Sequence, residues 1–208
     1  MSLLSKTPIY FGSYLVTPQA SFTFSPHNSH PTSASASCIP VFYTTPFSYA
    51  LVNLKPILPG HVLVCPLRPV PRLADLSTSE TSDLFLTVRR VSRMIERVYL
   101  GTSLNIAIQD GPEAGQSVPH VHVHIIPRRK ADLDHRGGSD ALYGMMEGDE
   151  GDIAKQLGEL AEAGKEGVEV GRVRFPAVDN EARKPRSEEE MRAEALALAK
   201  EMEGEPVD

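Results

Sequence analysis

The chain of 208 residues has only two cysteines, Cys38 and Cys65. They lie in a Ser/Pro/Ala-rich stretch and in a short apolar run, which is not the pattern of a disulfide-stapled secreted domain. The sequence also lacks the apolar run of about 18 to 20 residues that a membrane-spanning helix needs. Its opening MSLLSKTPIY has neither a signal-peptide core nor an Arg-rich transit pattern. We therefore expect reduced thiols, no contact with a membrane, and a location in the cytoplasm or also in the nucleus.

An excess of basic residues is missing as well, because 27 Asp and Glu against 21 Lys and Arg give a net charge of -6. Such a chain repels a phosphate backbone, so nucleic acid is excluded as the main partner. The net charge is still compatible with binding of a small anionic ligand, because hydrogen-bond donors close to the ligand outweigh a distant net charge. The length is enough for one catalytic unit, and 41% hydrophobic with 23% charged residues is ordinary for a globular protein.

Two short apolar runs, at residues 49–53 and 61–65, are separated by a Pro59-Gly60 turn signal and predict a pair of strands. Further along the chain, alternation of apolar and polar residues over 103–109 predicts a half-buried strand with one polar face.

A helix is predicted between these strands, because its apolar residues recur every three or four positions. Ser77 and Glu80 form a capping box at its start, and Gly101 stands where a left-handed residue would end it. The apolar stripe consists of Leu84, Val88, Val91, Ile95 and Val98.

The remainder of the chain sets the expected domain organisation. Residues 1–130 form the catalytic domain, in which the Ser/Pro/Ala-rich stretch 21–40 is a disordered insertion. Residues 131–186 are polar and Gly-rich and are expected to form a mobile loop. A second capping box begins a C-terminal helix within 187–208, which packs on the core. The fold class is therefore α+β: an antiparallel sheet of about five strands, one long helix and a C-terminal helix.

The segment HVHVHIIP places His120, His122 and His124 on one face of a predicted strand, with their side chains roughly 6.5 to 7 Å apart. Four interpretations compete. The histidines are satisfied core residues; they bind zinc or iron, although the preceding loop adds only Asp110 and Glu113 as ligands; they form a pH switch; or they carry phosphate chemistry.

The preceding loop, GPEAGQS, favours the phosphate interpretation. Its two glycines let backbone N–H groups approach a ligand closely, and Gln116 and Ser117 add side-chain donors. A phosphate held there presents its phosphorus to an imidazole on the following strand. A neutral histidine attacks without a separate base, and its ordinary pKa of about 6.5 leaves it mostly neutral at pH 7.

Together the segments ALVN, PGHVLVCPLRP, QDGPEAGQ and HVHVHIIP resemble the histidine triad superfamily, specifically its Fhit-like branch of dinucleoside triphosphate hydrolases. The resemblance implies a homodimer with a histidine triad (HIT) fold. It also implies hydrolysis of diadenosine triphosphate to AMP and ADP through a covalent nucleotidyl-histidine, which makes the protein a hydrolase of phosphorus-containing anhydrides.

Roles for the catalytic residues follow from the resemblance. His122 matches the nucleophile, and His124 the residue that hydrogen-bonds the α-phosphate or bridging oxygen. His120 would orient the nucleophile, with His61 in support. Gln109 would contact the scissile phosphate and the leaving group.

The resemblance also implies a set of substrate-binding residues. Asn53 would hold ribose hydroxyls, unless it only ends a strand and satisfies a turn. The phosphate cradle and the adenine pocket comprise Gly115, Gln116, Ser117 and Val118, and Phe11, Val16, Leu51 and Leu63.

No tightly bound cofactor and no metal ligand are expected, although Mg²⁺ or Mn²⁺ should accompany the polyphosphate. The nearest alternative activity is asymmetric cleavage of diadenosine tetraphosphate to AMP and ATP. A different class is a nucleotide-binding signalling module with slow turnover, suggested by Tyr143, which matches a regulatory tyrosine of the family.

Overall fold

The computed structural model describes residues 8–18, 39–148, 152–155, 158 and 186–207. Most of the predicted insertion and the greater part of the predicted mobile loop lie outside these residues. Residues 39 and 40, which we expected to end the insertion, instead begin a strand.

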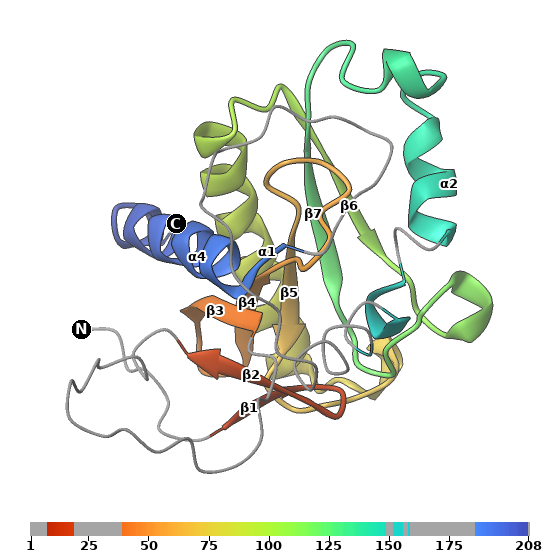
Figure 1. The fold of residues 1–208 in the computed structure, drawn as a ribbon. Coiled ribbons are helices and arrows are strands. Elements are labelled where there is room, and N and C mark those ends of the chain that lie inside the picture. The colour runs from red at the N-terminus through yellow and green to blue at the C-terminus, as the bar shows by residue number, and fades with distance from the viewer. Residues whose placement is uncertain (1–7, 19–38, 149–151, 156–157, 159–185, 208) are drawn as a thin grey trace, which may run out of the picture.

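The described chain is built on one seven-stranded sheet with the order β1-β2-β3-β4-β5-β7-β6 (Figure 1). Five of its strands, β3 to β7, form the antiparallel sheet that the sequence predicted. The hairpin β1-β2 extends it, because β2 pairs with β3 in parallel. The strand bounds are Ile9–Phe11, Tyr14–Pro18, Ile39–Thr44, Ser48–Val52, Val62–Pro66, Ser103–Ile108 and Val123–Arg128.

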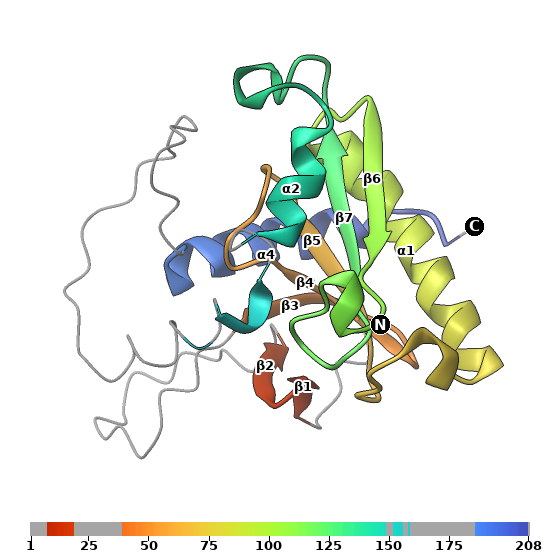
Figure 2. The ribbon, with the colours of Figure 1, turned by 90° about the vertical axis from the view of Figure 1, so that its right-hand side faces the viewer.

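The helices lie on both faces of the sheet, and Figure 2 shows α1 and α2 on opposite sides of β6 and β7. Their bounds are Thr78–Val98 for α1, Ala141–Glu147 for α2 and Glu188–Glu203 for α4. Short 3-10 turns occur at Leu73–Asp75 (η2), Pro112–Ala114 (η3) and Asp134–Arg136 (η4). No helix of the described ranges is both long and apolar enough to cross a bilayer.

Helix α1 begins as predicted. Ser77 and Glu80 form the capping box, and Arg68 binds Glu80 with an Nε to Oε1 distance of 2.7 Å. This hydrogen bond from Arg68 is the main reason that the pKa of Glu80 is lowered to about 2. The predicted end is wrong by one residue, because Leu100 rather than Gly101 takes the left-handed conformation. The amide of Gly101 then donates to Glu96 O at 2.8 Å and closes the last turn.

The C-terminal helix α4 also forms where it was predicted, with Ser187 and Glu190 as its capping box. One side of α4 packs into the main core beside α1 and β3, and its buried residues are Met191, Ala195, Leu198 and Met202.

The structure differs from the expected polar loop over residues 131–148, since this stretch contains η4 and α2. Leu142, Met145 and Met146 have the i, i+3, i+4 spacing of a helical stripe, which flanking glycines and charges concealed. They bury against Ile126 of β7 and Ile57 in a second apolar cluster. Burial of these side chains holds the segment on the sheet.

The same cluster shows which sheet face carries the histidines. Ala107 and Ile126 pack against α2, and His124 is the cross-strand partner of Ala107. His124 therefore lies on the sheet face that α2 covers.

We predict that Leu142→Ala lowers the free energy of unfolding by about 2 to 5 kcal/mol, because it removes a fully buried side chain and leaves a cavity. Urea denaturation measures the change. Tyr143→Ala, at a 59% exposed position of the same helix, is the control and should change stability by less than about 0.5 kcal/mol. Equal, negligible effects of both substitutions would mean that α2 is not packed on the sheet.

Candidate active site

The three triad histidines do not lie on one regular strand. β7 begins at Val123, so only His124 is a strand residue; His120 ends a bend at 118–120, and His122 lies between this bend and β7. The predicted single strand is therefore wrong, and the ring centroids of His122 and His124 are 5.0 Å apart rather than roughly 6.5 to 7 Å. The bend is closed by a hydrogen bond from His120 N to Val118 O at 2.7 Å.

His120 is fully buried and links two parts of the sheet. Its Nδ1 accepts a hydrogen bond from Gly12 N at 3.1 Å, so the proton is on Nε2, which donates to Pro66 O at 2.8 Å. Gly12 has a φ of 57°, and a Cβ there would lie 2.8 Å from a methyl group of Val118. Glycine at the β1-β2 turn thus permits the positive φ and the close approach to Val118.

His122 has the ring state of a nucleophile. Its Nδ1 donates to the backbone oxygen of His120 at 2.7 Å, which leaves the lone pair on Nε2. This Nε2 is buried and has no hydrogen-bond partner in the part of the chain that the structure describes. The ring of Phe11 packs edge-on against it, at 5.3 Å between centroids. His120 therefore orients His122 through its carbonyl group.

His61 determines which nitrogen of His124 carries the proton, through two successive hydrogen bonds. Ile57 N donates to His61 Nδ1 at 3.2 Å, so His61 carries its proton on Nε2. That nitrogen lies 2.9 Å from His124 Nδ1, to which it donates. The proton of His124 is then on Nε2, which is also buried and unpartnered among the described residues. A lone pair on His122 and an N–H donor on His124 therefore lie on adjacent rings.

Burial keeps these rings neutral. It lowers the pKa of His122 below its ordinary value and that of His124 well below it. For His120 it lowers the pKa to about 4, although the hydrogen bond to Pro66 O opposes the shift. Near pH 7 the site therefore presents a neutral lone pair on His122 and a neutral N–H donor on His124.

Gln109 lies just after β6 and is buried at the joint between α2 and the loop. Its Nε2 donates to Met146 O of α2 at 3.4 Å. Gly115 has a φ of 86°, and a Cβ on it would come within 2.5 Å of that same Nε2. Gly115, the second glycine of GPEAGQ, is thus required for the close contact with Gln109 as well as for the positive φ of the turn.

The loop 111–118, expected to bind phosphate, is folded more tightly than the sequence suggested. The amides of Gly115 and Gln116 donate to Pro112 O and Gly111 O, so they close η3 within the loop. The side-chain amide of Gln116 donates to Pro71 O at 2.8 Å. Ser117 Oγ accepts from Ala154 N at 3.4 Å and keeps its own proton to donate. Val118 is buried against Gly12.

Asn53 directly follows β4, and we predicted for it either a contact with ribose hydroxyls or a role in satisfying a turn. Its Oδ1 accepts from Lys55 N at 3.1 Å, which satisfies the turn. Its Nδ2 is 3.4 Å from each ring nitrogen of His61. In this structure Asn53 supports His61.

The four residues expected to form an adenine pocket belong to the main apolar core. Phe11 contacts the rings of His120 and His122. Leu63 is the cross-strand partner of His124 and of Leu51, so these leucines share the sheet face of the histidines. Val16 is buried on β2.

Residues 70–73, for which no sequence pattern predicted a role, contact Asp110 and Val121 on either side of the loop. Leu73 N donates to Asp110 Oδ1 at 2.8 Å, and Arg72 pairs with Asp110 Oδ2 at 3.3 Å. The bond to Leu73 is the main reason that the pKa of Asp110 is lowered. Val70 O accepts from Val121 N at 2.8 Å. Asp110 is thus occupied at the base of the loop, and no three His, Cys, Asp or Glu side chains of the described ranges form a metal-binding group.

The site thus has a buried imidazole lone pair beside an imidazole donor, and such a lone pair is the group that a histidine nucleophile needs. Residues 39–131 match the HIT domain family. An asymmetrical bis(5'-nucleosyl)-tetraphosphatase of Schizosaccharomyces pombe is 52% identical over 76% of this chain and 86% of its own. The bifunctional bis(5'-adenosyl)-triphosphatase/adenylylsulfatase FHIT of Arabidopsis thaliana is 46% identical over 66% of this chain and 71% of its own.

Among solved structures, that of Plasmodium falciparum diadenosine triphosphate hydrolase in complex with Cyclomarin A is 30% identical, with a TM-score of 0.52. The match covers 80% of this chain and 90% of that one. The chain belongs to the histidine triad (HIT) family, in its Fhit-like branch.

We predict a pH dependence of stability that arises from the buried histidines. Because the folded pKa of His120 is lowered to about 4 from an ordinary 6.5, the unfolded chain binds protons first as the pH falls. The contribution of His120 to the free energy of unfolding is complete above pH 6.5 and is lost toward pH 4. The loss is up to about 1.4 kcal/mol per pH unit for each such histidine.

Urea denaturation between pH 7 and 5, where carboxylates stay ionised, measures this slope. His120→Asn should make the slope shallower, because the buried imidazole with the lowered pKa is removed. Equal slopes for His120→Asn and the wild type would contradict the neutral, buried state.

Proposed function

We propose that the protein hydrolyses dinucleoside polyphosphates, chiefly diadenosine triphosphate to AMP and ADP. The observation that carries this proposal is the buried, unpartnered Nε2 of neutral His122, next to the unpartnered N–H of His124. An unpaired buried polar atom costs about 1 to 3 kcal/mol of stability. Two of them side by side indicate a site kept ready for a ligand. The relatives' names, a triphosphatase and a tetraphosphatase, indicate the same substrate class.

The geometry suggests two displacements. His122 Nε2 attacks the α-phosphorus, a P–N bond forms, and the P–O bond to the leaving ADP breaks. His124 Nε2–H donates a hydrogen bond to the oxygen on which charge develops. Water then attacks the same phosphorus, the P–N bond breaks, and AMP leaves with His122 neutral again.

The carbonyl of His120 has a particular function in the intermediate. Once Nε2 carries the nucleotide, the His122 ring keeps its proton on Nδ1 and is cationic. The 2.7 Å hydrogen bond from Nδ1 to His120 O stabilises that charge. The same bond therefore selects the attacking nitrogen and supports the ring after attack.

We propose that Mg²⁺ or Mn²⁺ enters with the polyphosphate as part of the substrate. The groups that the structure gathers at the site, neutral imidazoles, the Gln109 amide and the Ser117 hydroxyl, are uncharged. Charge on the polyphosphate then has to be balanced by a cation that it brings.

A homodimer is proposed as well. Strand β6 is an edge strand among the described strands, and its Ile106 is 50% exposed. Phe85 and Leu86 of α1 are also exposed apolar residues. Pairing of these faces across a two-fold axis would bury the apolar surface and extend the sheet.

A nucleotide-binding signalling module is the second candidate. Tyr143 is exposed on α2, the helix whose Met146 carbonyl accepts from Gln109. A bound dinucleotide that contacts Gln109 would thus be connected to the surface that displays Tyr143.

The test is chromatography of the products from diadenosine triphosphate and diadenosine tetraphosphate, with wild type, His122→Asn and the control His135→Asn. We expect AMP and ADP from the triphosphate, the same products with His135→Asn, and at least a 10³-fold lower rate with His122→Asn, since the nucleophile is lost. Faster cleavage of the tetraphosphate to AMP and ATP would change the preferred substrate and keep the mechanism. Full activity of His122→Asn would exclude the covalent route, and binding of both substrates without cleavage would favour the signalling module.

A further inference from the structure

Arg186 connects the C-terminal helix to the loop that ends β4. Its backbone N donates to Leu54 O at 3.2 Å, and its guanidinium donates to Asn53 O. The other side of the guanidinium forms an ion pair with Glu194 of α4, and both side chains are largely buried. The contact joins residues that are 133 positions apart in sequence.

Glu194 extends this connection to the far end of the same loop. Its Oε1 accepts a hydrogen bond from the hydroxyl of Tyr99 at 2.5 Å. The ring of Tyr99 packs directly against Gly60, where a Cβ would lie 2.5 Å from a ring carbon. Gly60 has a φ of 84° and precedes His61. Arg186 and Tyr99 therefore hold the loop 53–61 at its two ends.

This loop determines the proton positions in the active site. It contains Ile57, whose N–H sets the tautomer of His61, and it ends at His61 itself, whose N donates to Leu58 O at 3.1 Å. His61 in turn donates to His124 and leaves the proton of His124 on Nε2. A shift of the loop that breaks the bond from Ile57 allows His61 to place its proton on Nδ1. His124 would then have to donate to His61 and would lose its donor toward the substrate.

We propose that Arg186, Glu194 and Tyr99 are positioning residues of the active site, which hold the loop 53–61 so that His124 keeps its Nε2–H. They touch neither the triad nor the reacting atoms, and they act through Ile57 and His61. The effect on turnover rests on the proposed function, but the tautomers of His61 and His124 are measurable without any substrate.

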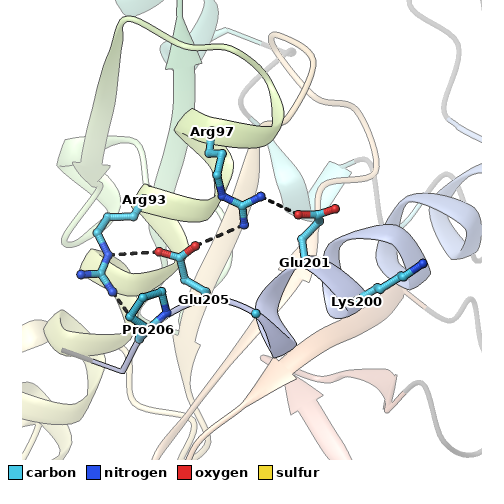
Figure 3. A pocket seen from close by; sticks show the side chains of 7 residues that line it. Arg93, Arg97, Lys200, Glu201, Glu205 and Pro206 are labelled. Atoms are coloured by element: carbon cyan, nitrogen blue, oxygen red, sulfur yellow. Dashed lines mark hydrogen bonds and ion pairs between the residues drawn. The ribbon is translucent and has the colours of Figure 1, made fainter.

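The other end of α4 provides a matched control. Arg97 of α1 pairs with Glu201 at 2.6 Å and with Glu205 at 3.2 Å, and Arg93 also pairs with Glu205 (Figure 3). These pairs attach the same helix to α1, at the end of α4 opposite to Arg186. Arg97→Gln therefore weakens helix docking and leaves the loop contacts in place.

The first experiment is ¹⁵N NMR of the imidazole nitrogens in the full chain without substrate. Wild type and Arg97→Gln should show the proton on Nε2 of both His61 and His124, and Arg186→Gln should show a mixture of tautomers for both residues. Tyr99→Phe, which keeps the ring against Gly60 and removes only the hydroxyl, should show a smaller shift in the same direction. Thermal unfolding confirms that each variant is folded at the measuring temperature. Unchanged wild-type tautomers in folded Arg186→Gln would overturn the proposal.

The second experiment is the steady-state cleavage of diadenosine triphosphate. Arg186→Gln should lower kcat about tenfold with KM changed less than about twofold, because the lost donor acts in the transition state. Arg186→Lys should recover part of kcat, and Arg97→Gln should match the wild type. An equal loss of kcat in Arg97→Gln would reduce the role of Arg186 to helix docking and overturn the proposal. A wild type that cleaves no dinucleotide would refute the proposed function instead, while the NMR comparison still decides the positioning role.

Discussion

The hydrogen bond from His122 Nδ1 to the carbonyl of His120 is the interaction on which the chemistry of the site depends. An imidazole has one lone pair when neutral, and this bond assigns it to Nε2. The bond exists because the chain bends before β7, so that the carbonyl of one triad residue faces the ring of the next. Had residues 120–128 formed a regular strand, that carbonyl would have paired with a neighbouring strand. The irregular backbone therefore leaves the lone pair of His122 on Nε2.

Stability opposes this arrangement and limits where it can be built. Two unpartnered ring nitrogens and three neutral imidazoles in the interior favour unfolding. The surrounding structure offsets the cost by packing: β4 and β5 are buried along their whole length, and α1 and α4 supply the apolar sides of the core. The polar groups around the triad are instead paired with backbone, as with His120 to Gly12 and Pro66. The ring nitrogens that orient the histidines therefore have hydrogen-bond partners, whereas the Nε2 atoms proposed to act on the substrate have none among the described residues.

Local patterns predicted the elements that are stabilised by local periodicity. The capping box and apolar stripe of α1, the paired strands β4 and β5, and α4 all followed from spacing. The apolar stripe of α2 was present in the sequence but short, and its glycines and charges suggested a loop. The histidines were found as a group, but their geometry was not, because a period of two cannot reveal a bend. Contacts such as Arg186 to Asn53 join distant segments and have no local signal at all.

Attack at the α-phosphorus, as proposed here, would explain why relatives of this chain are named both triphosphatase and tetraphosphatase. In the proposed reaction His122 and His124 act at the α-phosphorus and on the oxygen next to it, and the groups that fix them lie in the segment before β7, in β5, in the loop 53–61 and in the β1-β2 turn. The number of phosphates in the leaving group matters only beyond that oxygen. In the proposed mechanism a triphosphate would release ADP and a tetraphosphate would release ATP through the same two displacements, with the same nitrogen and the same donor. Preference between them must then come from residues outside the triad.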